Sequence, residues 1–266
     1  MNYPIRISEK IRGLLFCIMY NQAFLLILLF NTFLFGLCQK HDDIEPVDPF
    51  TIKHLQINNY HGPLTAEMLK LFKNVEILEN RQCNYTLFED RVLHVLPNLK
   101  KLAISNSNIV REAHDVSKCC RKLKEVEFIN SGLSDLPWHQ IDKDWPLEKI
   151  YLFREKCPKL AANMLVDKKL KHLTLTYSDL EIIEEGAFNG VKHLETLNLK
   201  RNKIKTITNK TLAPLKTLKE LDLSENLLEE ITAAQIPNLP NLEKLNIGHN
   251  PIKKSTSKKL GNCCRN

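Results

Sequence analysis

The sequence predicts an α/β fold: a curved, horseshoe-shaped solenoid of about nine repeats of 23–24 residues with a parallel sheet on its concave face. Three observations predict it. Aliphatic residues recur at a fixed period, each unit opens with a short alternating apolar pattern, and the later units carry Asn at one fixed position. With only 8 Gly among 266 residues, a fold built from many tight hairpin turns is disfavoured.

The repeat is best preserved in the unit that opens at Leu218 and continues with Leu221, Leu223, Asn226 and Leu228. The same frame fits the units before and after it, and it extends backwards through the chain. The predicted units open at Ile52, Val75, Leu99, Leu123, Leu147, Leu170, Leu194, Leu218 and Leu242. We therefore expect one continuous array over residues 52–252.

This pattern, L-x-x-L-x-L-x-x-N-x-L, is typical of leucine-rich repeats, and each position has a physical reason. The alternating leucines of a short strand point into a core that only stacked coils can close. The Asn side chain satisfies backbone groups where the chain turns, so Asn202, Asn226 and Asn250 predict an asparagine ladder. The earlier units are less regular. At the Asn position they carry Tyr60, Cys83, Ser107, Ser131, Glu155 and Ser178.

The amino terminus predicts export. Basic residues precede a strongly apolar stretch, and Gly36 and Cys38 supply the small residues that a signal peptidase requires, so residues 1–38 are interpreted as a signal peptide. The alternative is an uncleaved single-pass anchor at residues 14–37, which is long enough to span a bilayer. Two N-x-[ST] sequons, at Asn84 and Asn209, are glycosylation sites in an exported chain.

Both ends of the array need covering, because terminal coils expose core leucines. We expect the polar segment 39–51 to form the N-terminal cap and residues 253–266 a short C-terminal cap or tail. Cys263 and Cys264 predict an intermolecular disulfide and hence a linked dimer; the alternative is a pair between adjacent residues or within the cap. Cys83 and Cys157 are interpreted as small buried hydrophobic residues.

The predicted concave face is mostly polar, but repeats 4 to 6 place apolar and aromatic residues there. Exposed aromatic residues beside Arg are typical of the residues that dominate protein interfaces. The sequence therefore predicts a partner-binding site on the concave face, formed by Ile129, Tyr151, Phe153, Arg154 and Tyr177. The alternative is that the irregular repeat at 147–157 folds these rings inward or onto one another.

Other function classes find no support. The sequence contains no catalytic or phosphate-binding motif, and its nine His show no metal-ligand spacing. The net charge of +7 arises from interleaved acidic and basic residues, whereas nucleic-acid binders cluster their cations. We expect no catalytic residues, no metal, no cofactor, no small-molecule substrate and no nucleic acid.

Over residues 52–252 the chain resembles the extracellular leucine-rich repeat superfamily, to which the Phe188 segment (G-A-F-N-G-V) is also similar. The signal peptide, irregular early repeats, regular later repeats and double cysteine resemble the insect leucine-rich immune proteins of the mosquito type. The resemblance implies secretion, pairing through C-terminal cysteines and recognition of microbes with complement-like factors. The coiled-coil tail of those proteins is missing, so a short, coil-less relative is expected.

The sequence thus predicts a secreted, non-catalytic, protein-binding factor of insect innate immunity. The alternative function is that of an adhesion or scaffold protein held in the membrane by the uncleaved 14–37 segment.

Overall fold

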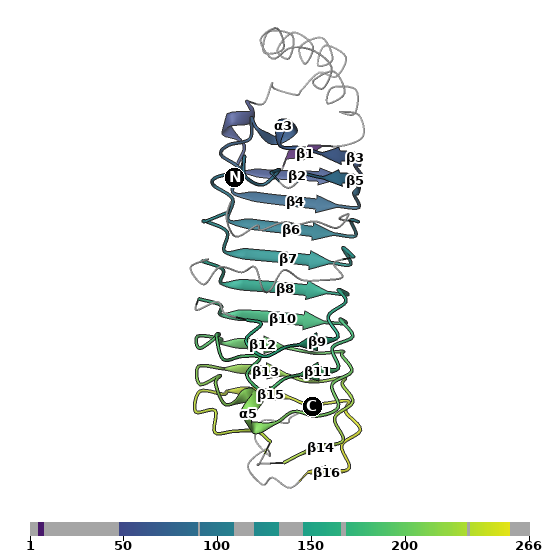
Figure 1. Ribbon diagram of the computed structural model, residues 1–266, viewed down its shortest axis with the longest axis vertical. Helices are drawn as coiled ribbons and strands as arrows, with labels where there is room; N and C mark the ends of the chain where they lie inside the picture. Colours follow the sequence, from purple (N-terminus) through teal and green to yellow (C-terminus); the bar gives the residue numbers. More distant parts are fainter. Residues whose placement is uncertain are drawn as a thin grey trace.

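A computed structural model describes residues 5–7, 48–89, 91–108, 120–132, 146–165, 169–232 and 235–255. It shows an elongated solenoid with one ten-stranded parallel sheet along its length (Figure 1). In spatial order the strands are β1 (Ile5–Ile7), β2 (His54–Asn58), β4 (Ile77–Arg81), β6 (Lys101–Ser105), β7 (Glu125–Ile129), β8 (Lys149–Phe153), β10 (His172–Thr176), β12 (Thr196–Asn198), β13 (Glu220–Asp222) and β15 (Lys244–Asn246).

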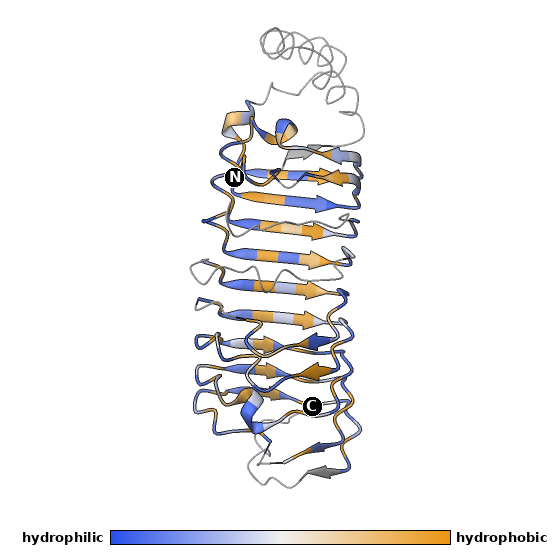
Figure 2. Ribbon diagram, in the orientation of Figure 1, coloured by the Kyte–Doolittle hydropathy of each residue, from blue (hydrophilic) through white to orange (hydrophobic). Residues whose placement is uncertain are grey.

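Nine of these strands, β2 to β15, begin two residues after the nine predicted repeat starts. The register pairs equivalent positions of neighbouring repeats, as in Leu197 with Leu221 and Leu221 with Leu245. Those leucines are buried in a single core that runs through the described coils. Along most of the strands, though not along β4, hydrophobic and hydrophilic residues alternate (Figure 2), which directs one set into the core and the other onto the concave face. The predicted solenoid is confirmed.

The rest of each coil is short and irregular. It contains the 3₁₀ turn η2 (Pro49–Thr51), the helices α3 (Ala66–Leu69) and α5 (Asn209–Leu212), and three two-stranded parallel ladders. These pair β3 (His61–Leu64) with β5 (Asn84–Phe88), β9 (Lys159–Leu160) with β11 (Ile182–Ile183), and β14 (Glu230–Ile231) with β16 (Lys254–Ser255). Phe188 lies outside the sheet and is fully buried, closing the core from the convex side.

The three Asn of the regular repeats lie at the turn after each strand and hydrogen-bond across coils. The Asn226 amide donates to the carbonyls of Leu199 and Leu223, both within 3.0 Å, and its oxygen accepts from the backbone of Ile204 at 3.1 Å. Asn202 and Asn250 repeat this arrangement one coil away on either side. Neighbouring coils are thereby joined through side chains as well as through the sheet.

The irregular repeats fill the same position with other buried groups. The Ser107 hydroxyl accepts from the backbone of Cys83 at 3.0 Å, and the Glu155 carboxylate accepts from the backbone and hydroxyl of Ser131 at 2.6 and 2.8 Å. Ser178 is 1% exposed, and its backbone donates to the first Asn of the regular set. The polar column therefore runs beyond the three Asn.

Cys83, Cys120 and Cys157 are all buried. Cys157 is 4% exposed in the core, and burial raises the pKa of its thiol to about 11, so the reactive thiolate is scarce near neutral pH. The interpretation of Cys83 and Cys157 as small hydrophobic residues agrees with this burial. The predicted intermolecular pair, Cys263 and Cys264, lies outside the described residues.

The ends of the array are described only in part. Of the predicted N-terminal cap, residues 48–51 form a turn that Asp48 caps, and the side chain of Asn74 donates to the carbonyl of Phe50 at 2.6 Å. No helix within the described ranges is long and apolar enough to cross a bilayer. The predicted signal peptide, except for the three residues of β1, and the alternative 14–37 anchor lie outside those ranges.

Candidate protein-docking surface

Strand pairing brings the predicted docking residues of β7 and β8 onto one patch of the concave face. Ile129 pairs with Phe153, and Phe153 pairs with Thr176 of the next repeat. Tyr151 lies two residues before Phe153 on the same side of β8. Ile129 and Phe153 thus lie on adjacent strands, as the repeat pattern predicts.

The remaining two residues follow the strands and pack against this patch. The rings of Phe153 and Tyr177 lie 4.9 Å apart between centroids at 56°. The guanidinium carbon of Arg154 lies 5.3 Å from the Phe153 centroid and 5.6 Å from that of Tyr177. The rings therefore pack onto each other, as the alternative interpretation held, yet they do so at the surface and not in the core.

Exposure distinguishes the members of the patch. Tyr151 is 37% exposed and Arg154 is exposed, whereas Ile129, Phe153 and Tyr177 are half-buried. Burial, with a smaller contribution from the Glu127 charge, raises the pKa of Tyr151, which therefore presents a neutral phenol at physiological pH. A partner would contact the exposed ring of Tyr151, the exposed guanidinium of Arg154 and the half-buried side chains beside them.

Backbone geometry fixes the position of Arg154 and Tyr177. The eighth residue of every repeat is left-handed, with φ between +48° and +58°, and none of the nine is glycine. We call these residues the left-handed row: Asn59, Gln82, Asn106, Asn130, Arg154, Tyr177, Arg201, Glu225 and His249. For most side chains this conformation costs about 1 kcal/mol or more. The backbone amides of this row extend the hydrogen bonding of the sheet beyond the strands. The amide of Arg154, for example, donates to the carbonyl of Thr176 at 3.1 Å.

The left-handed row also contributes a residue that sequence reasoning missed. The Arg201 guanidinium carbon lies 4.8 Å from the Tyr177 centroid, and its side chain is ion-paired with Glu225. Lys200 pairs with the same carboxylate at 3.0 Å. Tyr177 therefore contacts one Arg from the preceding repeat and one from the following repeat. The sequence does contain a signal for Arg201: it is the eighth residue of its repeat, the position that Tyr177 occupies in the repeat before.

The N-terminal part of the concave face differs from the solvated surface that the sequence predicts. Gln56 is only 3% exposed. It donates to Glu79 at 3.2 Å, and Glu79 also contacts Arg81 at 2.9 Å. The charges of this polar cluster are therefore paired internally.

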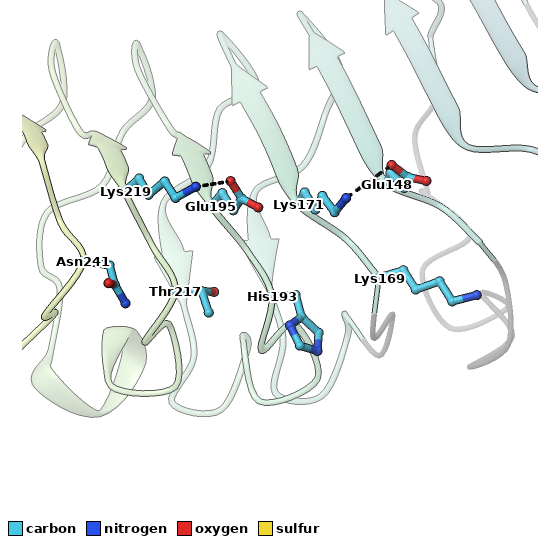
Figure 3. Close-up of a pocket in the computed structure, with 8 residues that line it drawn as sticks. All are labelled: Glu148, Lys169, Lys171, His193, Glu195, Thr217, Lys219 and Asn241. Atoms are coloured by element: carbon cyan, nitrogen blue, oxygen red, sulfur yellow. Dashed lines mark hydrogen bonds and ion pairs between the residues drawn. The ribbon is translucent and has the colours of Figure 1, made fainter.

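A hollow of about 510 Å³ lies near the edge where the strands begin and is lined by residues of repeats 5 to 8 (Figure 3). Its charged lining residues are mostly paired, with Lys219 2.7 Å from Glu195 and Lys171 3.7 Å from Glu148 (Figure 3). Within the described ranges, no group of three His, Cys, Asp or Glu is arranged to hold a metal ion. We assign this hollow no ligand, because the described ion pairs account for most of its charges.

Both sequon asparagines are exposed and lie off the main sheet. Asn84 is the first residue of β5, and Asn209 is the first residue of α5. A glycan at either position would project from the sides of the coils that do not carry the docking residues. The two predicted glycosylation sites are therefore compatible with an open concave face.

The leucine rich repeat family matches residues 168–228 and 210–252. No curated protein sequence matches the chain. Solved structures share the fold at low identity. The TLR13–ssRNA13 complex superposes with a TM-score of 0.63 and 19% identity over 81% of this chain and 32% of that chain. The LRIM1/APL1C complex superposes with a TM-score of 0.60 and 21% identity over 80% of this chain and 39% of that chain. The leucine-rich repeat domain of APL1B superposes with a TM-score of 0.57 and 19% identity over 91% of this chain and 78% of that chain.

This chain spans about a third of the TLR13 chain and over three quarters of the APL1B domain. Identities this low establish a shared fold only. Together with the strand register and the repeat match, they show that the chain folds as a leucine-rich repeat solenoid.

Proposed function

We propose that this chain is a secreted, non-catalytic recognition protein that binds a protein partner on its concave face and acts in insect innate immunity. The observation that carries the proposal is the patch of Tyr151, Phe153, Tyr177 and Arg154 on an otherwise polar sheet face. Aromatic residues and Arg supply most of the binding energy in protein interfaces. The immune role is supported by the resemblance to insect leucine-rich immune proteins and by the shared fold of APL1B and LRIM1/APL1C.

The binding site is tested by the double substitution Tyr151→Ala and Phe153→Ala. Insect haemolymph is passed over the immobilised full chain, and the retained proteins are identified and quantified. We expect capture of the specific partner to fall by at least tenfold, since central aromatic residues contribute about 2 kcal/mol or more. Ile182→Ala is the matched control, because Ile182 is 54% exposed but lies on β11, outside the main sheet.

Circular dichroism and thermal melting establish that both variants remain folded. Undiminished capture by the folded double variant would reject the concave site, whereas equal loss in the Ile182 variant would indicate nonspecific adsorption to apolar side chains.

Secretion and dimer formation are tested by expressing the full chain in insect cells. Medium and membranes are run on reducing and non-reducing gels before and after deglycosylation. We expect product in the medium that begins at Gln39, carries glycans on Asn84 and Asn209, and runs as a dimer through Cys263 or Cys264 without reductant. Membrane-bound product that retains Met1 would instead establish the anchored adhesion or scaffold protein.

A further inference from the structure

Arg154 differs from the other cations of the sheet surface in lacking an acidic partner. We compared it with every Lys and Arg that lies on the main-sheet strands β2 to β15, directly before one of these strands, or in the left-handed row. Each of these other cations lies within 4.0 Å of a carboxylate oxygen. Lys101, for example, lies 2.8 Å from Glu125 and 3.1 Å from Glu127. No carboxylate of the described residues pairs with Arg154.

The Arg154 guanidinium is nevertheless held in place. It lies over the rings of Phe153 and Tyr177, 5.3 and 5.6 Å from their centroids, on a residue fixed at φ +58°. Contacts with ring faces leave the N–H groups at the edge of the guanidinium plane free to donate, and a carboxylate matches that edge with two parallel hydrogen bonds. A cation positioned in this way loses less side-chain freedom when it binds an anion.

The surroundings indicate what kind of anion fits. Beside the guanidinium lie the exposed ring of Tyr151 on β8 and the half-buried aliphatic side chain of Ile129 on β7. The next cations along the face, Lys200 and Arg201, both pair with the carboxylate of Glu225. A polyanion such as RNA or a sulfated glycan gains affinity from several unpaired cations at once, and this patch offers one. A single carboxylate beside an apolar side chain is the better match.

We infer that Arg154 is a specificity-determining residue that receives an Asp or Glu side chain of an extended peptide segment, with a neighbouring aromatic or aliphatic residue of that segment against Tyr151. This inference rests on the proposed protein-binding function and adds the chemistry of the partner.

The test uses a phage-displayed library of random linear peptides selected on the immobilised full chain. Wild type, Arg154→Gln, Arg154→Lys, the Tyr151/Phe153 double Ala variant and the control Lys244→Gln are compared. Gln is suitable at 154 because Gln82 occupies the same left-handed position in repeat 2. Lys244 lies on the same sheet but is paired with Glu220.

We expect wild type to enrich peptides in which Asp or Glu stands beside an aromatic or aliphatic residue. By fluorescence anisotropy, a synthetic peptide of that kind should bind Arg154→Gln about 10- to 100-fold more weakly, the range expected for a charge-assisted bidentate pair. Arg154→Lys should recover only part of the affinity, and Lys244→Gln should match wild type. Replacing the peptide's acid by its amide should weaken wild-type binding equally and abolish the difference between wild type and Arg154→Gln.

Other outcomes overturn the inference in separable ways. Enriched peptides that need Tyr151 and Phe153 but show no acidic preference, or that bind Arg154→Gln undiminished, would reject the role of Arg154 and leave the docking surface intact. Peptides that bind the double Ala variant as well as wild type would reject the docking surface itself. Single-stranded RNA or heparin binding that is lost in Arg154→Gln, without selection of acidic peptides, would replace the peptide by a polyanion.

Discussion

At the scale of single residues, Asn226 joins two neighbouring coils through one side chain. Replacing Asn226 by Ala leaves the backbone groups of Leu199, Leu223 and Ile204 without their buried partner. We expect the free energy of unfolding to fall by about 1–3 kcal/mol, the usual cost of unsatisfied buried polar groups, as measured by urea denaturation. Asn246→Ala, at an exposed position, is the control and should change stability by less than about 0.5 kcal/mol. Equal effects would mean that the ladder contributes nothing specific.

A second Asn has the opposite effect on stability. Asn80 points into the core at a position where its register partners are Ile57 and Ile104, and it is fully buried. Neither polar atom of its side chain has a hydrogen-bond partner among the described residues. Asn80→Val should therefore raise the free energy of unfolding by about 1–3 kcal/mol, read from the shift in urea midpoint. A loss of stability would show that Asn80 is satisfied in solution. Ser105→Val, on the concave side of the next strand, serves as the control.

At the scale of elements, the edge where the strands begin carries interleaved acidic and basic residues from successive coils. Hydrogen bonds from Lys100, Lys124 and Lys219 lower the pKa of Glu76, Glu148 and Glu195 respectively. Each bond links one coil to the next. The edge is exposed, so its contribution depends on ionic strength.

This edge predicts an acid-dependent loss of stability. Because the folded pKa values of these carboxyls are lowered, their stabilising contribution is complete above the unfolded value of about 4.3 and is lost as the pH falls through the folded values. We expect melting temperatures to be level from pH 7 to 5 and to drop below about pH 4. Glu148→Gln should reduce the size of that drop, and 1 M NaCl should reduce it further. A drop that neither change affects would show that these ion pairs do not cause the acid sensitivity.

At the scale of the whole molecule, the fold was predictable from the repeat period of the sequence, whereas individual side-chain contacts were not predictable. The recurrence of leucine and Asn established nine strands and their register, since each repeat position must stack on its equivalent. Arg201 was missed because its role depends on a ring in the preceding repeat. The burial of Gln56 and of Glu155 was likewise not predictable, because a polar residue at a repeat position shows neither its burial nor its partner.

A stacked array of this kind should be least stable at an end coil. In the last described repeat Leu242, Ile247 and Ile252 are half-buried, whereas the equivalent Leu218, Leu223 and Leu228 are 0% exposed. Because each coil contacts only its neighbours, the stability of a repeat array is nearly a sum of local terms. Backbone amides of residues 242–250 should therefore exchange hydrogen at least tenfold faster than those of 218–226.

The same difference should appear in substitutions measured by urea denaturation. Leu218→Ala should cost about 2–5 kcal/mol, the usual range for a fully buried leucine, and Leu242→Ala less than about half as much, because part of its surface already contacts solvent. Equal protection of the two segments together with equal costs would show that the last coil is covered in solution. That result would direct the search for the covering surface to residues 253–266 of this chain or to a partner subunit, and it would make the last repeat, rather than the concave face, the first place to look for an interface.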